Sequence, residues 1–266
     1  MMQPLQIIDL AAIIVTFFFF ALGSYFDLKT REVDDRVWLI YAPIGGALTV
    51  LRLLNDPSLL LITLVSIAVT VLVSFGLFYF GLFGGADSKA IMCLGLTMPL
   101  PPTIFQPLLG YVHPVFPLVV IIIGFICSAF AGVWIGFRNL LVYAREGRRM
   151  FEGLEHEAWW RKASAMILGY RTELSKLRST FYLYPMEQIV QDNEGAHRTL
   201  KLYVNAEADR EQAVSEFSDL ATKEGYHGRV WVTPGLPMLL FLLIGLGFTL
   251  VLGDAIFATV LLLAHR

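Results

Sequence analysis

Charged residues are scarce in this chain. Asp, Glu, Lys and Arg make up 16% of its 266 residues, whereas a soluble domain usually carries about 25%. Hydrophobic residues make up 56%, and the mean hydropathy is +0.66. Several apolar runs exceed the ~18 residues that indicate a membrane span. The shortage of charge therefore excludes an ordinary soluble globular protein and predicts an integral membrane protein.

Cysteine is also scarce. The chain has two, Cys93 and Cys127, and both lie in apolar segments, so the sequence supports neither a disulfide framework nor a metal site. The stretch HEAWW at His156 begins like a zinc motif but lacks the second histidine. We therefore expect no metal and no cofactor, and we expect no nucleic-acid partner.

Lysine and arginine are missing from the first ten residues. A signal peptide has a basic stretch before its apolar core, so the first apolar run is predicted to be a retained span. A helix of about 20 residues rises about 30 Å, which is one hydrocarbon thickness. Six spans are predicted, at residues 7–26, 37–54, 59–80, from 88 into a proline-rich stretch, 115–137 and 236–264.

A polar segment with most of the charge lies between the fifth and sixth predicted spans. RTLKLYVN and RVWVTP alternate like strands there, and residues 206–225 resemble an amphipathic helix that ends at Gly225. The predicted fold is a membrane all-α bundle of six transmembrane helices with a small cytoplasmic α/β domain inserted between helices 5 and 6. The predicted domains are 1–137, 138–235 and 236–266.

Basic residues indicate the orientation. With the N-terminus outside, every Lys and Arg except Arg52 and Arg266 falls on the inner side, as is typical of cytoplasmic segments. The sequence therefore predicts a multi-pass protein of the cell membrane with its soluble domain in the cytoplasm. Asp9 and Asp254 then lie near the outer face.

Two adjacent tryptophans in the polar segment have two interpretations. Trp159 and Trp160 precede Arg161 and Lys162, a composition that fits a helix lying on the inner membrane surface. Packing in the core of the soluble domain is the equal alternative.

Two aspartates are predicted at the same depth, on the cytoplasmic side. Asp27 follows the first span in DLKTREVDD, and Asp87 precedes the fourth in FGGADSK. The ordinary interpretation is that Asp87 caps a helix and that Asp27 is solvated. Gly84 and Gly85 favour a functional site instead, because glycine lets the backbone turn tightly or approach another chain closely.

At these residues the chain resembles a known family. GGAD resembles the Gly-x-Gly-Asp signature of membrane aspartyl proteases, and DLKTREVDD resembles the first aspartate region of the prepilin and preflagellin peptidases, especially their archaeal branch. VWVTPGLPMLLFLLIG is similar to the segment by which archaeal members enter their final helix. The resemblance covers nearly the whole chain, and the missing PAL triplet separates it from presenilin-like relatives. Ala86 replaces the second signature glycine, so a loop that needs positive φ there would differ.

The resemblance implies an activity. It implies a membrane aspartyl endopeptidase in which Asp27 and Asp87 are the catalytic residues, without a metal. Its partners would be the lipid bilayer and preflagellin- or prepilin-like substrates, whose short basic leader is removed at the cytoplasmic face. The sequence leaves the oligomeric state open.

Further residues near this pair are predicted to bind substrate. Asp34 and Asp35 would attract basic residues of the leader, although their loop is neutral overall and simple solvation is the alternative. Gly84 and Gly85 would let the substrate backbone come close. Lys89 either stabilises an ionised Asp87 or extends its charge to the membrane interface.

Two other classes of function fit membrane carboxylates. A transporter could use them for cation or proton coupling, but they lie at the predicted interface and not near the midplane, and no paired repeats of broken helices are visible. A non-enzymatic membrane anchor for the soluble domain would keep its activity when both aspartates are replaced.

Overall fold

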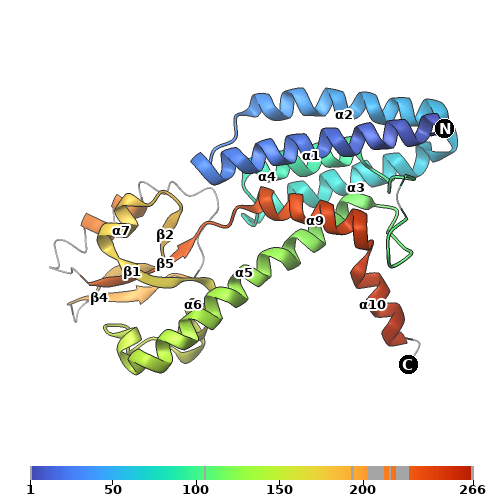
Figure 1. The fold of residues 1–266 in the computed structure, drawn as a ribbon. Helices are drawn as coiled ribbons and strands as arrows, with labels where there is room; N and C mark the ends of the chain where they lie inside the picture. The colour runs from blue at the N-terminus through green and yellow to red at the C-terminus, as the bar shows by residue number, and fades with distance from the viewer. Residues whose placement is uncertain are drawn as a thin grey trace. The chain divides into compact units, whose positions relative to one another are not determined.

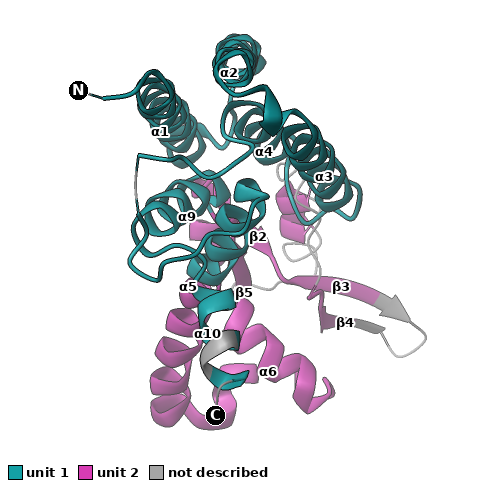
Figure 2. Ribbon diagram, turned by 90° about the vertical axis from the view of Figure 1, so that its right-hand side faces the viewer, with its two compact units in different colours: residues 1–128, 237–266 teal, residues 129–236 magenta. Residues whose placement is uncertain are grey.

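A computed structural model describes residues 2–104, 106–192, 195–202, 213–215, 217–219 and 228–264. The chain divides into two compact units, which are coloured separately in Figure 2. We call residues 1–128 with 237–266 the bundle unit, and residues 129–236 the sheet unit.

Long apolar helices dominate the structure (Figure 1). Among the described residues, four helical segments are long and apolar enough to cross a membrane: Pro4–Thr30, Asp35–Asn55, Pro57–Tyr79 and Phe116–Phe151. They contain α1 (Pro4–Thr30), α2 (Asp35–Asn55), η1 (Pro57–Leu59) with α3 (Leu60–Tyr79), and α5 (Phe116–Glu146) with η2 (Gly147–Phe151). A multi-pass membrane protein follows from these lengths and compositions.

The other two predicted spans are shorter than expected. The fourth corresponds to α4 (Gly85–Thr97), whose 13 residues rise only about 20 Å. The sixth is divided at Gly253, which has a φ of 87°, into α9 (Met238–Leu252) and α10 (Ala255–Ala264). Glycine permits this left-handed conformation, and the regular helix ends there. The structure therefore supports four full-length spans and does not establish six.

Helix α3 is polar inside and apolar outside. Its buried residues are Thr63, Ser66, Thr70 and Ser74, whereas leucines such as Leu61 are exposed. The hydroxyl groups of Ser66, Thr70 and Ser74 donate to backbone carbonyls, that of Ser74 to Ser88 at the start of α4 over 2.8 Å. Small polar residues permit close helix packing in lipid, where an exposed leucine costs nothing. This polarity fits a helix surrounded by a bilayer.

A buried ion pair joins α1, α2 and the proline-rich loop after α4. Asp9 Oδ1 lies 3.4 Å from Arg52 Nη1, and both side chains are buried. The other carboxylate oxygen of Asp9 accepts hydrogen bonds from the N–H and the hydroxyl of Thr103 at 2.6 and 2.7 Å. Arg52 also donates to the carbonyls of Leu100 and Pro101. Both carboxylate oxygens of Asp9 are thus engaged, and Asp9 is the centre of a structural cluster.

The sheet unit contains short strands and helices. A three-stranded antiparallel sheet has the order β1 (Tyr170–Glu173), β5 (Arg229–Pro234) and β2 (Leu183–Pro185). Tyr170 faces Val232, and Leu183 faces Pro234. The helices are α6 (Trp159–Leu168) and α7 (Leu174–Ser179), and β3 (Glu187–Asp192) pairs with β4 (Gly195–Leu200) in a second sheet. The strand predicted at RVWVTP is confirmed as β5.

Two predictions in this unit are only partly described. The predicted strand RTLKLYVN begins within β4, and its end at 203–205 lies outside the described residues. Of the predicted helix 206–225, the structure describes 213–215 and 217–219, and both stretches are helical.

The tryptophans of α6 are not core residues. The side chain of Trp159 is 80% exposed and that of Trp160 51%, so the core-packing interpretation is wrong. On its other side, α6 is attached to α5 through Asn139, whose amide donates to the carbonyls of Met166 and Gly169. A location of α6 on the membrane surface remains a prediction.

Candidate active site

Asp27 lies near the C-terminal end of α1. The helix continues past the apolar run to Thr30 and ends at Arg31, which has a left-handed conformation with a φ of 61°. This turn lets Arg31 Nη1 approach Asp27 Oδ1 to 3.4 Å. The buried Oδ2 of Asp27 has no hydrogen bond of standard geometry among the described residues. The nearby backbone N–H of Leu239, in the first turn of α9, favours the charged form of the carboxyl group.

Asp87 is the third residue of α4, and Gly84 is the N-cap. Its Oδ2 accepts a hydrogen bond from the N–H of Gly84 at 3.2 Å. The carboxylate therefore lies in the first helical turn, where the helix dipole favours negative charge. The prediction that Asp87 is the N-cap is wrong, because Gly84 occupies that position. The carboxylate of Asp87 still stabilises the start of the helix by accepting the hydrogen bond from Gly84.

The signature glycines do not serve a left-handed turn. Gly84 has a φ of −73°, and Ala86 lies inside the helix, so the replacement of glycine by alanine costs nothing here. The left-handed glycine of this loop is Gly81, with a φ of 66°. A Cβ at Gly84 would meet only Asp87 Oδ2, at an ordinary 3.5 Å. Neither backbone conformation nor packing explains the glycine at 84.

The packing of α1 against α4 places Asp27 and Asp87 at the same end of the bundle unit. The charges of Asp27 and Arg31 both act on the carboxyl group of Asp87. The C-terminal end of α1 and the N-terminal ends of α2, α4 and α9 meet at this end of the bundle unit (Figure 1). Three N-terminal helix ends carry partial positive charge, which suits a site that contains two acids. We call Asp27 and Asp87 the carboxyl pair.

Close packing holds α1, α2 and α9 together one turn before Asp27. A Cβ at Gly23 would lie 3.1 Å from Cη2 of Trp38 on α2 and 3.3 Å from Cδ1 of Leu239 on α9. A larger residue at 23 would make both side chains shift by a few tenths of an ångström, so glycine favours this close approach of the helices. No motif marks Gly23, Ser24 or Trp38 in the sequence, because they are isolated residues within apolar runs.

The other predicted substrate residues lie at the start of α2 and α4. Asp34 is the N-cap of α2, and its Oδ1 accepts from the N–H of Arg36 at 2.8 Å. Lys89 Nζ lies 2.6 Å from Asp35 Oδ1, so the lysine joins α4 to α2. Both side chains of this pair are largely exposed, and such a pair contributes at most about 1 kcal/mol.

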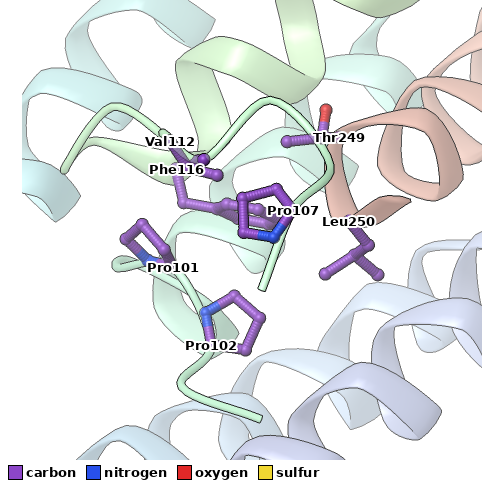
Figure 3. Close-up of a pocket in the computed structure, with 8 residues that line it drawn as sticks. Pro101, Pro102, Pro107, Val112, Phe116, Thr249 and Leu250 are labelled. Carbon is purple, nitrogen blue, oxygen red and sulfur yellow. The ribbon is translucent and has the colours of Figure 1, made fainter. Parts of the chain in front are cut away.

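Figure 3 shows the lining of an apolar pocket in the bundle unit that contains neither member of the carboxyl pair. Its lining comes from the proline-rich loop, the start of α5 and the end of α9: Pro101, Pro102, Pro107, Gly110, Val112, Phe116, Thr249 and Leu250. Pro101 accepts a hydrogen bond from Arg52 at the C-terminal end of α2, the opposite end of that helix from Asp35. The lining has no carboxyl, imidazole or thiol group, so this pocket is no candidate for acid–base chemistry.

Clusters of metal-ligating side chains do not occur in the described part of the chain. No group of three or more His, Cys, Asp or Glu residues is placed to hold a metal ion there. Cys93 is buried and Cys127 is partly buried, and both are free thiols.

Comparison with known proteins identifies the chain. The geometry defines a membrane protein with two acids at one end of a helical bundle. The model of the family described as type IV leader peptidase matches residues 14–143, and that described as archaeal peptidase A24 C-terminus, type II, matches residues 161–255. The chain belongs to this leader peptidase family, and it is therefore a protease.

Named relatives support this membership. A preflagellin peptidase of Methanocaldococcus jannaschii is 27% identical over 244 residues, which cover 88% of this chain and 91% of the relative. A preflagellin peptidase of Methanococcus maripaludis is 26% identical over 243 residues, covering 88% and 92% of the two chains. A third, of Methanococcus voltae, is 25% identical over 248 residues, covering 90% and 94%.

Proposed function

We propose that the protein is a membrane aspartyl endopeptidase that removes the short basic leader from preflagellin- or prepilin-like proteins at the cytoplasmic face of the membrane. The observation that carries the proposal is the packing of α1 against α4, which places Asp27 near the end of one helix and Asp87 in the first turn of the other, near enough for the two charges to interact. The relatives named preflagellin peptidases support the class of substrate. The excess of Lys and Arg in the predicted inner segments supports the cytoplasmic face.

The proposed chemistry needs one ionised and one protonated carboxyl group. Two acids held close share a proton, because both cannot ionise easily. Water attacks the scissile carbonyl carbon while the ionised group takes a proton from the water and the protonated group donates to the carbonyl oxygen. Collapse of the tetrahedral intermediate breaks the C–N bond, and the leaving amine receives the proton. The pair titrates as a unit, and the mechanism uses no metal.

A cleavage assay in membranes tests the proposed function. The substrate is a fusion protein with a Lys/Arg-rich leader followed by an apolar helix, and mass spectrometry identifies the released leader. We expect one product, cut at the leader–helix boundary, at the same rate with and without a chelator. Membranes without the chain are the control. An uncut substrate, or a rate that collapses with the chelator, would contradict the proposal.

The glycine at 84 is proposed to leave room for substrate. A side chain at this position would stand next to Asp87 Oδ2. Gly84 and Gly85 together expose bare backbone beside the acid, where an extended substrate segment can approach. This role extends the prediction made from the signature.

Asp34 is proposed to attract the basic leader. Its side chain is 63% exposed, and its ion pair with Arg36 is long, at 4.0 Å, whereas Asp35 and Lys89 are 2.6 Å apart. Asp34→Ser separates charge from helix capping, because serine caps nearly as well as aspartate. We expect kcat/KM to fall about threefold to tenfold for a basic leader and to stay unchanged for a neutral one, as for a partly screened charge pair.

Asp56→Ser is the matched control for this variant. Asp56 is also an N-cap, at η1, and accepts from the N–H of Ser58. An equal fall in kcat/KM in both variants, or a fall that does not depend on the charge of the leader, would contradict a role of Asp34 in substrate binding.

A further inference from the structure

Three buried polar atoms around the end of α1 have no hydrogen-bond partner among the described residues. They are Oγ of Ser24, Oδ2 of Asp27 and Nε1 of Trp38. The residues Ser24 and Trp38 are 3% and 4% exposed. An unpaired buried donor costs folding free energy, so each such group calls for an explanation.

The three groups belong to one place. Ser24 and Asp27 are three residues apart on α1 and share a face with Gly23, since all three fall within about 100° of the helix circumference. The benzene ring of Trp38 lies against Gly23, with Cη2 3.1 Å and Cζ2 3.7 Å from a Cβ at that position. Nε1 is on the same edge of the indole as Cζ2. The indole N–H therefore lies within one ring width of Gly23, one turn before Asp27 on α1.

Neither donor makes a hydrogen bond within the described part of the protein. Comparable hydroxyls in the bundle unit donate to the carbonyl four residues earlier, as Thr16 does to Ala12 and Thr249 to Gly245, but the structure has no such bond at Ser24. The backbone carbonyl of Trp38 faces Cys93 Sγ at 3.9 Å, a contact that leaves the indole N–H unused. Both donors are buried and have no partner among the described residues, and both lie at the turn of α1 that precedes Asp27.

We propose that Trp38 Nε1–H and Ser24 Oγ–H bind main-chain carbonyl oxygens of the substrate beside the bond that is cut. This inference rests on the proposed function. A substrate that enters as a helix must unwind locally before a peptide bond is accessible, and unwinding frees carbonyls that find little water near a bilayer. Two preplaced donors satisfy such carbonyls and fix the scissile bond relative to Asp27 and Asp87. Ser24 and Trp38 are thus positioning residues for an extended segment.

The test uses the variants Trp38→Phe and Ser24→Ala in the full chain. Phenylalanine keeps an aromatic ring but has no N–H. We expect kcat/KM for the leader fusion to fall about tenfold in each variant, as for one lost hydrogen bond to substrate. We expect the uncut fusion to bind about tenfold more weakly when Trp38→Phe is added to Asp87→Asn. The thermal unfolding midpoint should stay the same or rise, because an unpaired donor has been removed.

Trp231→Phe is the matched control. Trp231 is buried in the sheet unit, and its Nε1 likewise has no partner among the described residues. We expect the same direction of change in stability and no change in kcat/KM. Wild-type cleavage by Trp38→Phe and Ser24→Ala, or a loss of activity that follows a loss of stability, would overturn the inference.

The outcomes separate this inference from the proposed function. Cleavage that survives in Asp27→Asn or Asp87→Asn contradicts the proposed function and, with it, the inference. Cleavage lost in both of those variants but unaffected in Trp38→Phe and Ser24→Ala contradicts the inference alone.

Discussion

Asp27→Asn and Asp87→Asn are each expected to reduce the rate of leader cleavage by about 10²-fold to 10⁴-fold, the usual contribution of a positioned acid or base. Asparagine can neither take a proton from water nor donate one as a carboxylic acid does. Both chains should fold, because asparagine at 87 can still accept the hydrogen bond from the N–H of Gly84. At 27, the change removes one partly exposed ion pair with Arg31, a small loss.

The measurement is the initial rate of leader release at equal amounts of folded protein in membranes. Asp254→Asn is the matched control. Asp254 lies between two apolar helices near the C-terminus, and its carboxylate accepts a hydrogen bond from the N–H of Phe257, as that of Asp87 does from Gly84. We expect this control to cleave like the wild type. A wild-type rate in either Asp27→Asn or Asp87→Asn would make that aspartate a helix-stabilising or interfacial charge. It would also favour the anchor or transport functions over proteolysis.

Arg52→Met is expected to destabilise the fold by about 3–5 kcal/mol, because it leaves the buried carboxylate of Asp9 without its counter-charge. The loss also frees the carbonyls of Leu100 and Pro101, which Arg52 bonds. Asp9→Leu combined with Arg52→Met should recover much of the stability, since an apolar pair of similar volume often replaces a buried ion pair without cost.

Unfolding in mixed detergent micelles, followed by tryptophan fluorescence, measures these differences. Arg36→Met is the control for the change of residue type. Arg36 is highly exposed, and its ion pair with Asp34 is long, at 4.0 Å. We expect less than about 1 kcal/mol there. A loss for Arg52→Met as small as that for Arg36→Met, or a double variant worse than both single ones, would contradict a structural role for the pair.

Local pattern predicted the long helices and the membrane class, because apolar runs and their lengths are sequence-local properties. The ends of helices are less predictable, because they depend on single backbone angles. The fifth span was expected to end at Phe137, before the first arginine, but α5 runs on to Glu146 and ends at the left-handed Gly147. A charge does not end a helix once it has left the apolar region, whereas a positive-φ glycine does.

The candidate site was predictable in part for similar reasons. The signature and the span order locate Asp27 and Asp87 at one end of the bundle. Tertiary contacts decide the rest: Lys89 pairs with Asp35 on another helix, and Trp38 lies against Gly23. Such contacts join residues far apart in the chain and depend on which helix faces which, and one sequence alone does not specify those faces.

The polarity of α3 limits how its sequence can change. Lipid accepts almost any aliphatic or aromatic side chain, so the exposed positions near Leu61 are free to drift. The row of buried hydroxyl residues from Thr63 to Ser74 is not free, because Ser66 and Ser74 bond the carbonyls of Pro99 and Ser88 on a neighbouring segment. Substitutions tolerated in α3 should therefore recur about every 3.6 residues, and a scan of all its positions would reveal a narrow intolerant line of small residues. A reader who assumed a water-soluble helix would assign the inner and outer faces of α3 the wrong way round.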